Sequence, residues 1–222
     1  MIVVIGQPVL RTTPAGAHAA GMAAVVAAEA ARRGATVQLI GKVGEDRAGE
    51  EVVLALARDG IGHVALLRDP YRQTPRLVAE SVAEPDEVEL DDDAGLPVER
   101  LDPADPAQRP AFDAGDLELG LRYLTEFGVL VATEPLDDAL ARVVADAAGW
   151  SGATLIAVAA RDGGEPPGLP PAAIVLVAPE ADPDDVFGRL VGSLAASIDS
   201  GTEPGAAFRD IVAAAGWEPA ET

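Results

Sequence analysis

Apolar residues in the stretch 20–66 recur first with helical and then with strand-like spacing. Residues 21–33 carry a helical apolar stripe that stops at Gly34, and residues 37–40 form a short β-branched run. A second helical segment at 50–58 follows a turn that is punctuated by glycine. The stripe of the first helix consists of Met22, Val25, Val26 and Ala30. This alternation with short connections predicts right-handed crossovers onto a mostly parallel sheet.

The same patterning continues to the end of the chain. Apolar runs predict further strands at 1–5, 128–132, 154–159 and 172–178. Amphipathic spacing predicts helices at 117–124, 137–148, 183–198 and 204–215. The inward faces of the second and third of these helices are expected to be Leu140, Val143, Val144 and Ala147, and Phe187, Leu190, Val191 and Leu194.

Three further segments are expected outside this alternating core. Strand-like alternation at 74–82 with a return at 88–90 predicts a hairpin. Residues 7–19, which contain Pro8 and Pro14, are expected to form a short surface loop. Residues 91–116 are rich in Asp and Pro and are expected to be an exposed, irregular connection.

Composition narrows the classes of function. With 222 residues and 49% hydrophobic content, the chain can bury one good core, so a single domain over 1–222 is expected. No apolar run reaches membrane-spanning length, and no basic segment precedes the first strand, so a cytoplasmic location is expected. The absence of Cys and the presence of only two His argue against disulfides, thiolate chemistry and a His-based metal site. A net charge of −21 argues against nucleic-acid and anionic-membrane partners.

The glycine motifs of the stretch 20–66 also carry a family resemblance. They are Ala20-Gly21, then Ala31-Arg32-Arg33-Gly34, then Gly41-Lys42-Val43-Gly44-Glu45-Asp46-Arg47-Ala48-Gly49. These motifs resemble the N-terminal signature of the ribokinase-like carbohydrate kinases, also called the phosphofructokinase B family. The resemblance implies a three-layer α/β/α sandwich with a mostly parallel sheet, in which the lid is reduced to a small hairpin at about 74–90.

The resemblance also implies a chemistry, which is transfer of the γ-phosphoryl group of ATP to a sugar hydroxyl with Mg²⁺ present. Asp185 stands at the position of the family's catalytic base, and Asp182, Pro183 and Asp184 stand at the position of its glycine-rich anion hole. The positions that correspond to substrate contacts are Gly21, Val25, Asp46, Gly49 and Glu134. The cations that could meet an anion are Arg11, Lys42, Arg72 and Arg76.

Several of these positions depart from the family pattern. Pro183 has no N–H to donate, and Asp182 and Asp184 bring negative charge to the place of the phosphate, so either carboxylate could instead cap the following helix. Val25 replaces a substrate-binding Asn, and the chain contains no Asn for the family's Asn-x-x-Glu magnesium motif. Glu134 can equally be a plain turn residue. The segment between the strands at 154 and 172 is too short for the family's nucleotide-binding insertion.

Three functions therefore remain open. The first is a catalytically impaired relative that keeps a ligand-binding, assembly or regulatory role, with a small sugar or nucleoside as its ligand. The second is an active, divergent sugar or nucleoside kinase that uses Asp185 with ATP and Mg²⁺. The third is a structural oligomer. Because an isolated two-strand hairpin is marginal in water, the hairpin is expected to pack on the body or to pair across a two-fold axis, which would give a homodimer.

Overall fold

A parallel sheet forms the centre of the molecule in the computed structural model, which describes residues 1–79, 99–161, 166, 168–180, 182 and 184–214. The sheet has six strands in the order β10-β9-β8-β1-β4-β5, and each neighbouring pair is parallel. Its strands are β1 (Ile2–Ile5), β4 (Val37–Gly44), β5 (Leu66–Asp69), β8 (Val129–Ala132), β9 (Thr154–Ala159) and β10 (Ile174–Val177). The mostly parallel sheet predicted from the apolar runs is thus confirmed.

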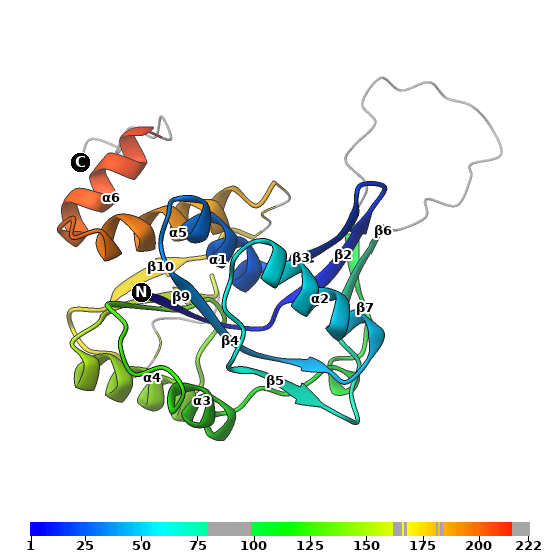
Figure 1. The fold of residues 1–222 in the computed structure, drawn as a ribbon. Coiled ribbons are helices and arrows are strands. Elements are labelled where there is room, and N and C mark those ends of the chain that lie inside the picture. The colour runs from blue at the N-terminus through cyan, green and yellow to red at the C-terminus, as the bar shows by residue number, and fades with distance from the viewer. Residues whose placement is uncertain (80–98, 162–165, 167, 181, 183, 215–222) are drawn as a thin grey trace.

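Helices cover both faces of this sheet (Figure 1). The helices are α1 (Met22–Arg32), α2 (Arg47–Arg58), α3 (Ala114–Leu121), α4 (Asp138–Ser151), α5 (Val186–Asp199) and α6 (Pro204–Ala214). Because side chains of β1 alternate, Ile2 and Val4 join the core under α1, α2 and α5, whereas Val3 and Ile5 join the core over α3 and α4. The predicted three-layer α/β/α sandwich is confirmed. No helix in the described part of the chain is long and apolar enough to cross a membrane.

A second sheet rises from one end of the central sheet (Figure 1). It has four strands in the order β3-β2-β6-β7 and is called the small sheet below. Its strands are β2 (Val9–Thr13), β3 (Gly16–Ala20), β6 (Arg76–Ala79) and β7 (Glu99–Asp102). The prediction of a surface loop at 7–19 is wrong, because β2 and β3 pair as an antiparallel hairpin there. Pro8 precedes the first strand and Pro14 lies in the two-residue turn, so the prolines bracket the strands and do not interrupt them.

The segment that follows β6 also differs from expectation. The predicted return strand at 88–90 lies outside the described residues, and β6 pairs in an antiparallel manner with β7, in the segment that was expected to be irregular. Helix α3 begins at Ala114, earlier than predicted, because Asp113 and Asp116 form a reciprocal capping box. Both differences occur in short, polar elements, whose few apolar residues show no clear helical or strand-like periodicity.

The inward face of α4 is rotated relative to the predicted stripe. Ala141, Val144 and Ala148 are buried, whereas Leu140, Val143 and Ala147 are only partly buried. Small alanine side chains allow the helix to lie close to the sheet, which leaves the larger residues at the margin of the contact. In α5 the prediction agrees better, since Leu190, Val191 and Leu194 are buried and Phe187 packs at the edge of the core.

Helices α1 and α5 pack unusually close together because glycine faces the contact. A Cβ at Gly188 would lie 2.8 Å from Val25 Cγ1, and one at Gly192 would lie 2.5 Å from the carbonyl oxygen of Val26. Next to this contact, Ser193 Oγ donates to Glu29 Oε1 at 3.1 Å. Burial alone would raise the pKa of Glu29, but hydrogen bonds from Arg33 and Ser193 outweigh it and lower that pKa. The contact fixes the start of α5 beside the start of α1.

Replacing Gly192 with Ala should therefore destabilise the fold by about 1–3 kcal/mol, because backbone atoms of α1 would have to move. Urea unfolding followed by circular dichroism measures this loss. Gly149→Ala is a matched control, since Gly149 is an exposed position of α4 with nothing within 4 Å of the added Cβ. The control should be neutral or stabilising by up to about 1 kcal/mol. Equal stability of the two variants would contradict the close contact.

Candidate functional site

The strand order reverses direction between β1 and β8. From β1 the chain proceeds to β4 and β5 on one side, and β8, β9 and β10 occupy the other side. The two connections cover opposite faces, α1 on one and α4 on the other, so the chain leaves the carboxyl ends of β1 and β8 toward opposite faces of the sheet. Ligands of open α/β sheets bind at such a switch point. A ligand site is therefore expected among the residues that follow these two strands.

Glu134 connects the two strand ends at the switch point. Its Oε1 accepts the backbone N–H of Gln7 at 2.6 Å, and the side-chain Nε2 of Gln7 donates to the carbonyl of Pro110 at 2.9 Å. Burial raises the pKa of Glu134, and the single N–H of Gln7 only partly offsets that effect. The carboxyl group thus holds the turn after β8 against the turn after β1, and it retains one oxygen for a further partner.

A cavity of about 210 Å³ lies between the small sheet and the starts of α1 and α5. At ~30 Å³ per water, it has room for roughly seven water molecules or for a ligand of similar size. The lining residues are Arg11, Gly21, Met22, Val25, Leu77, Asp182, Asp185 and Gly188. The fold therefore brings together four of the predicted site positions, namely Gly21, Val25, Asp182 and Asp185, from two separate parts of the sequence.

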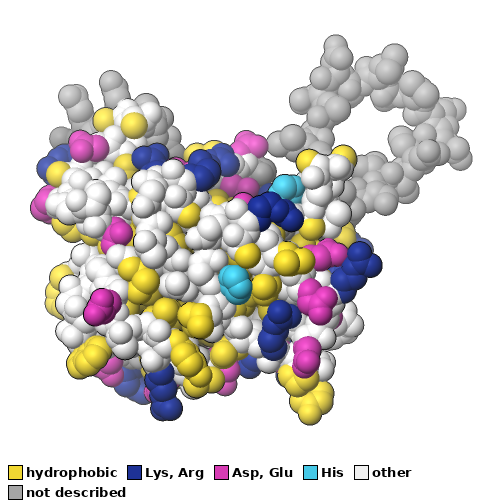
Figure 2. All heavy atoms as spheres, in the orientation of Figure 1, with side chains coloured by type: hydrophobic (Ala, Val, Ile, Leu, Met, Phe, Trp, Pro, Cys, Tyr) yellow, Lys and Arg dark blue, Asp and Glu magenta, His cyan; other side chains and the backbone are white. Residues whose placement is uncertain are grey.

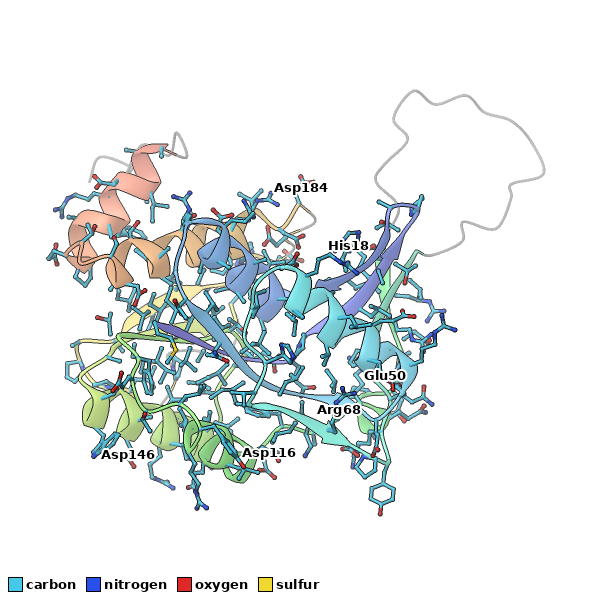
Figure 3. All side chains as sticks on the ribbon, viewed as in Figure 1. His18, Glu50, Arg68, Asp116, Asp146 and Asp184 are labelled. Carbon is cyan, nitrogen blue, oxygen red and sulfur yellow. The ribbon has the colours of Figure 1, made fainter. Side chains whose placement is uncertain are left out.

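Asp182 occupies the amino terminus of α5 with its carboxylate. Oδ1 accepts the N–H of Phe187 at 3.0 Å, and Oδ2 accepts the N–H of Gly188 at 3.1 Å. These are free amides of the first helical turn, which carry the positive end of the helix dipole. Asp182 thus makes the capping contacts that the sequence offered as the alternative to an anion hole. Asp184 is exposed on the loop that leads into α5 (Figure 3), and Pro183 lies outside the described residues.

Asp185 faces the cavity in a left-handed backbone conformation, with φ at 55°. Its side chain makes no capping hydrogen bond to α5, and its Oδ2 instead pairs with Arg11 Nη1 at 3.2 Å. Arg11 also donates from Nε to Glu99 Oε2 at 3.1 Å and pairs with it through Nη2 at 2.9 Å. Burial lowers the pKa of Arg11, but the two carboxylates outweigh it and raise that pKa. An acceptor hydroxyl in the cavity would therefore have to compete with the Arg11 guanidinium for Asp185 Oδ2.

Asp46 and Gly49 lie apart from this cavity and stabilise a turn. Asp46 Oδ1 accepts the N–H of Gly49 at 2.8 Å and the hydroxyl of Thr74 at 2.7 Å, while Oδ2 accepts the N–H of Thr74 at 3.0 Å. Burial raises the pKa of Asp46, but these hydrogen bonds outweigh it and lower that pKa. Asp46 thereby begins α2 and holds the start of β6 at the same time.

Two of the other predicted cations, Lys42 and Arg72, are engaged elsewhere. Lys42 pairs with Asp116 at 2.9 Å, and Arg72 donates to the carbonyls of Ala107 and Arg109. Glu99, Gln7 and Leu77 were not predicted as site residues. Gln7 and Glu99 lie in segments that were expected to be irregular, and nothing in the predicted strand at 74–82 indicated that Leu77 would lie near α5. A larger apolar groove of about 580 Å³ lies between α3 and α4, but none of the predicted site residues lines it.

The residues present do not fit ATP and Mg²⁺ in this arrangement. Two amides that could hold a phosphate already hold Asp182, and the cavity is small for a nucleotide. Within the described residues, no three His, Asp or Glu side chains gather as metal ligands would. Strands β9 and β10 are direct neighbours, and only residues 160–173 connect them.

The comparisons with known proteins support the fold alone and do not establish an activity. No protein-family model matches the chain, and no curated protein matches it. A carbohydrate kinase from Agrobacterium tumefaciens superposes with a TM-score of 0.64 at 18% identity, over 97% of this chain and 89% of that one. A putative ribokinase II from E. coli, solved with ATP and Mg²⁺, gives 0.63 at 12% identity, over 95% and 89%.

An uncharacterized sugar kinase from Pyrococcus horikoshii gives a TM-score of 0.51 at 17% identity, over 72% of this chain and 52% of that one. This chain therefore spans about half the length of that structure. At identities this low the likeness establishes a ribokinase-like kinase fold, as the sequence motifs had implied.

The burial of Glu134 makes stability depend on pH in a defined direction. Because the pKa of Glu134 is raised from its ordinary value of 4.5, the folded state binds the proton more tightly than the unfolded state. Stability is therefore lost as pH rises from 4.5 through the folded pKa. Glu134→Gln carries no ionisable group there and lacks this loss. The free energy of unfolding of Glu134→Gln minus that of the wild type should therefore be larger at pH 7 than at pH 4, and urea unfolding measures both.

The matched control for this prediction is Glu126→Gln, which removes a charge from an exposed position. Its stability difference from the wild type should change less between the two pH values than that of Glu134→Gln. Equal changes in the two variants would contradict the assignment.

Proposed function

We propose that this chain is a catalytically impaired protein of ribokinase-like fold that binds a small polar ligand in the cavity beside Asp185. A neutral sugar or sugar-like polyol suits the size of the cavity and its mixture of apolar and charged lining residues. The observation that carries the proposal is the pair of hydrogen bonds from α5 to the carboxylate of Asp182. They fill with a negative group the place where a kinase of this fold would need to hold a transferring phosphoryl group.

Electrostatics at α5 support the loss of phosphoryl transfer. Removing one preorganised anion-binding donor costs about 3–4 kcal/mol in other enzymes, and here two amides are committed to Asp182. The carboxylate itself also repels a phosphate. In addition, Asp185 Oδ2 is paired with Arg11, so a substrate hydroxyl would have to displace that guanidinium to reach it. Each of these features separately disfavours phosphoryl transfer.

An active sugar or nucleoside kinase is the second candidate, and one observation favours it. Asp185 lines the same cavity as Gly21 and Val25, at the position where a base would meet a bound hydroxyl. Activity would require Asp182 to leave the amides and Arg11 to release Asp185 before ATP and Mg²⁺ could act. A homodimer remains a proposal, with less support, because β6, the first strand of the predicted hairpin, already pairs with β2 and β7 of the small sheet.

Under this proposal, ATP with Mg²⁺ should not phosphorylate ribose, fructose, adenosine or similar acceptors. A coupled ADP-release assay over a sugar and nucleoside panel measures this, together with melting temperatures to detect binding without turnover. Turnover near a typical ~10 per second that disappears in Asp185→Asn would establish the kinase instead. A polyol that raises the melting temperature without ADP release is the expected result.

A second test addresses the amides of α5. Asp182→Ala should lower stability by about 1 kcal/mol through loss of the cap, and should free the N–H groups of Phe187 and Gly188. Inorganic phosphate should then raise the melting temperature of this variant and leave the wild type unchanged. Asp184→Ala is the matched control, because it removes the same charge from an exposed side chain two residues away. A phosphate response in the wild type or in the control would contradict the proposal.

A further inference from the structure

We propose that the ion pair between Arg11 and Asp185 is a latch that holds the small sheet closed over the cavity. The two residues come from different parts of the molecule, since Arg11 belongs to β2 of the small sheet and Asp185 immediately precedes α5 of the body. Charged side chains of both signs gather where α5 approaches the β2–β3 hairpin (Figure 2). This inference concerns access to the cavity and holds whether or not the proposed ligand is correct.

Strand pairing holds the guanidinium in position from the side of the small sheet. Arg11 lies opposite Leu77 of β6, and β6 in turn pairs with β7, which carries Glu99. Glu99 Oε2 accepts from Nε and also forms an ion pair with Nη2, so it holds one side of the planar guanidinium. The remaining Nη1 is thereby directed at Asp185. Glu99 moves with the small sheet, and Asp185 alone of the three belongs to the body.

The side chain of Asp185 makes this contact and does not cap the helix. Among the described residues, Asp185 is the one non-glycine residue with positive φ, at 55°. Such a conformation costs free energy and persists where the surroundings compensate for it. The carbonyl of Asp185 accepts the N–H of Arg189 at the start of α5, but its side chain makes no cap, and the carboxylate of Asp182 accepts from the helix amides instead. The two carboxylates thus have separate roles: Asp182 caps α5, and Asp185 pairs with Arg11 across the cavity.

The strength of the pair suits a contact that opens and closes. The side chains of Arg11 and Asp185 are 25% and 27% exposed, so solvent screens the pair partly. Elsewhere β3 packs against α1 and α2, and β2, which pairs with β3, also packs against α2, so these contacts anchor one edge of the small sheet to the body. Opening would therefore turn the small sheet about this edge and lift β6, with Leu77, away from the cavity. A ligand would enter in that open state.

Amide hydrogen exchange of the full chain, read by mass spectrometry, tests the latch without any ligand. The variants are Arg11→Gln, Asp185→Asn and the double variant. Asn accepts the left-handed conformation as Asp does, so Asp185→Asn removes the charge and keeps the backbone. Each single variant should speed exchange in β2 and β6 by about two- to fivefold, and β1 and β8 should be unchanged. The double variant should be no faster than Arg11→Gln, because that variant already removes the pair with Asp185.

The matched control is Arg47→Gln, which breaks an exposed pair with Glu51 within α2. It should leave exchange in β2 and β6 unchanged. Unchanged exchange in both single variants, additive effects in the double variant, or equal acceleration of β1 and β8 would each overturn the latch. The last of these outcomes would mean that the pair merely stabilises the whole fold. Because the experiment contains neither sugar nor ATP, its failure is distinguishable from a failure of the proposed function.

Discussion

The close contact of α1 with α5 is the constraint on which the rest of the site depends. Gly188 and Gly192 allow the two helices to approach until side chains of one meet backbone of the other. A larger residue at either position would push the start of α5 away from Gly21 and Val25, and the cavity would lose its shape. Glu29 and Ser193 add a polar contact to the same helix pair. The packing of α5 against α1 therefore sets the direction of the α5 amides independently of the charges at the site.

Charge then decides what those amides can hold. The cavity is lined by one guanidinium and two carboxylates, and a third carboxylate, that of Glu99, shares the guanidinium. With Asp182 on the helix terminus and Asp185 on Arg11, each strong donor at the site already has an acceptor from the chain itself. Such a site is satisfied without a ligand and offers little to a further anion. The proposed loss of phosphoryl transfer rests on this combination of a ribokinase-like fold with donors that are already occupied.

The sequence predicted the central sheet well and the small sheet poorly, for a physical reason. Strands such as 154–159 are buried on both faces and read as continuous apolar runs. Strands β2 and β3 are short, half-exposed and rich in Ala, Thr and Gly, so no run distinguishes them from a loop. Their partners are equally weak, since β7 is Glu-Arg-Leu-Asp. Only pairing between segments far apart in the chain makes these residues a sheet.

By itself the sequence determined the alternating strands and helices, the glycine turns and the replacement of small residues by Asp182, Pro183 and Asp184. These features follow from hydrophobic periodicity, side-chain volume and charge, which can be read from neighbouring residues without knowledge of the fold. Tertiary structure alone decided that Asp182 would hold the helix amides and that Asp185 would meet Arg11 and, through it, Glu99. The reason is that Arg11, Glu99 and Asp185 come from distant segments, and no local pattern encodes contacts between them. Their meeting depends on sheet register and on the glycine contact between α1 and α5.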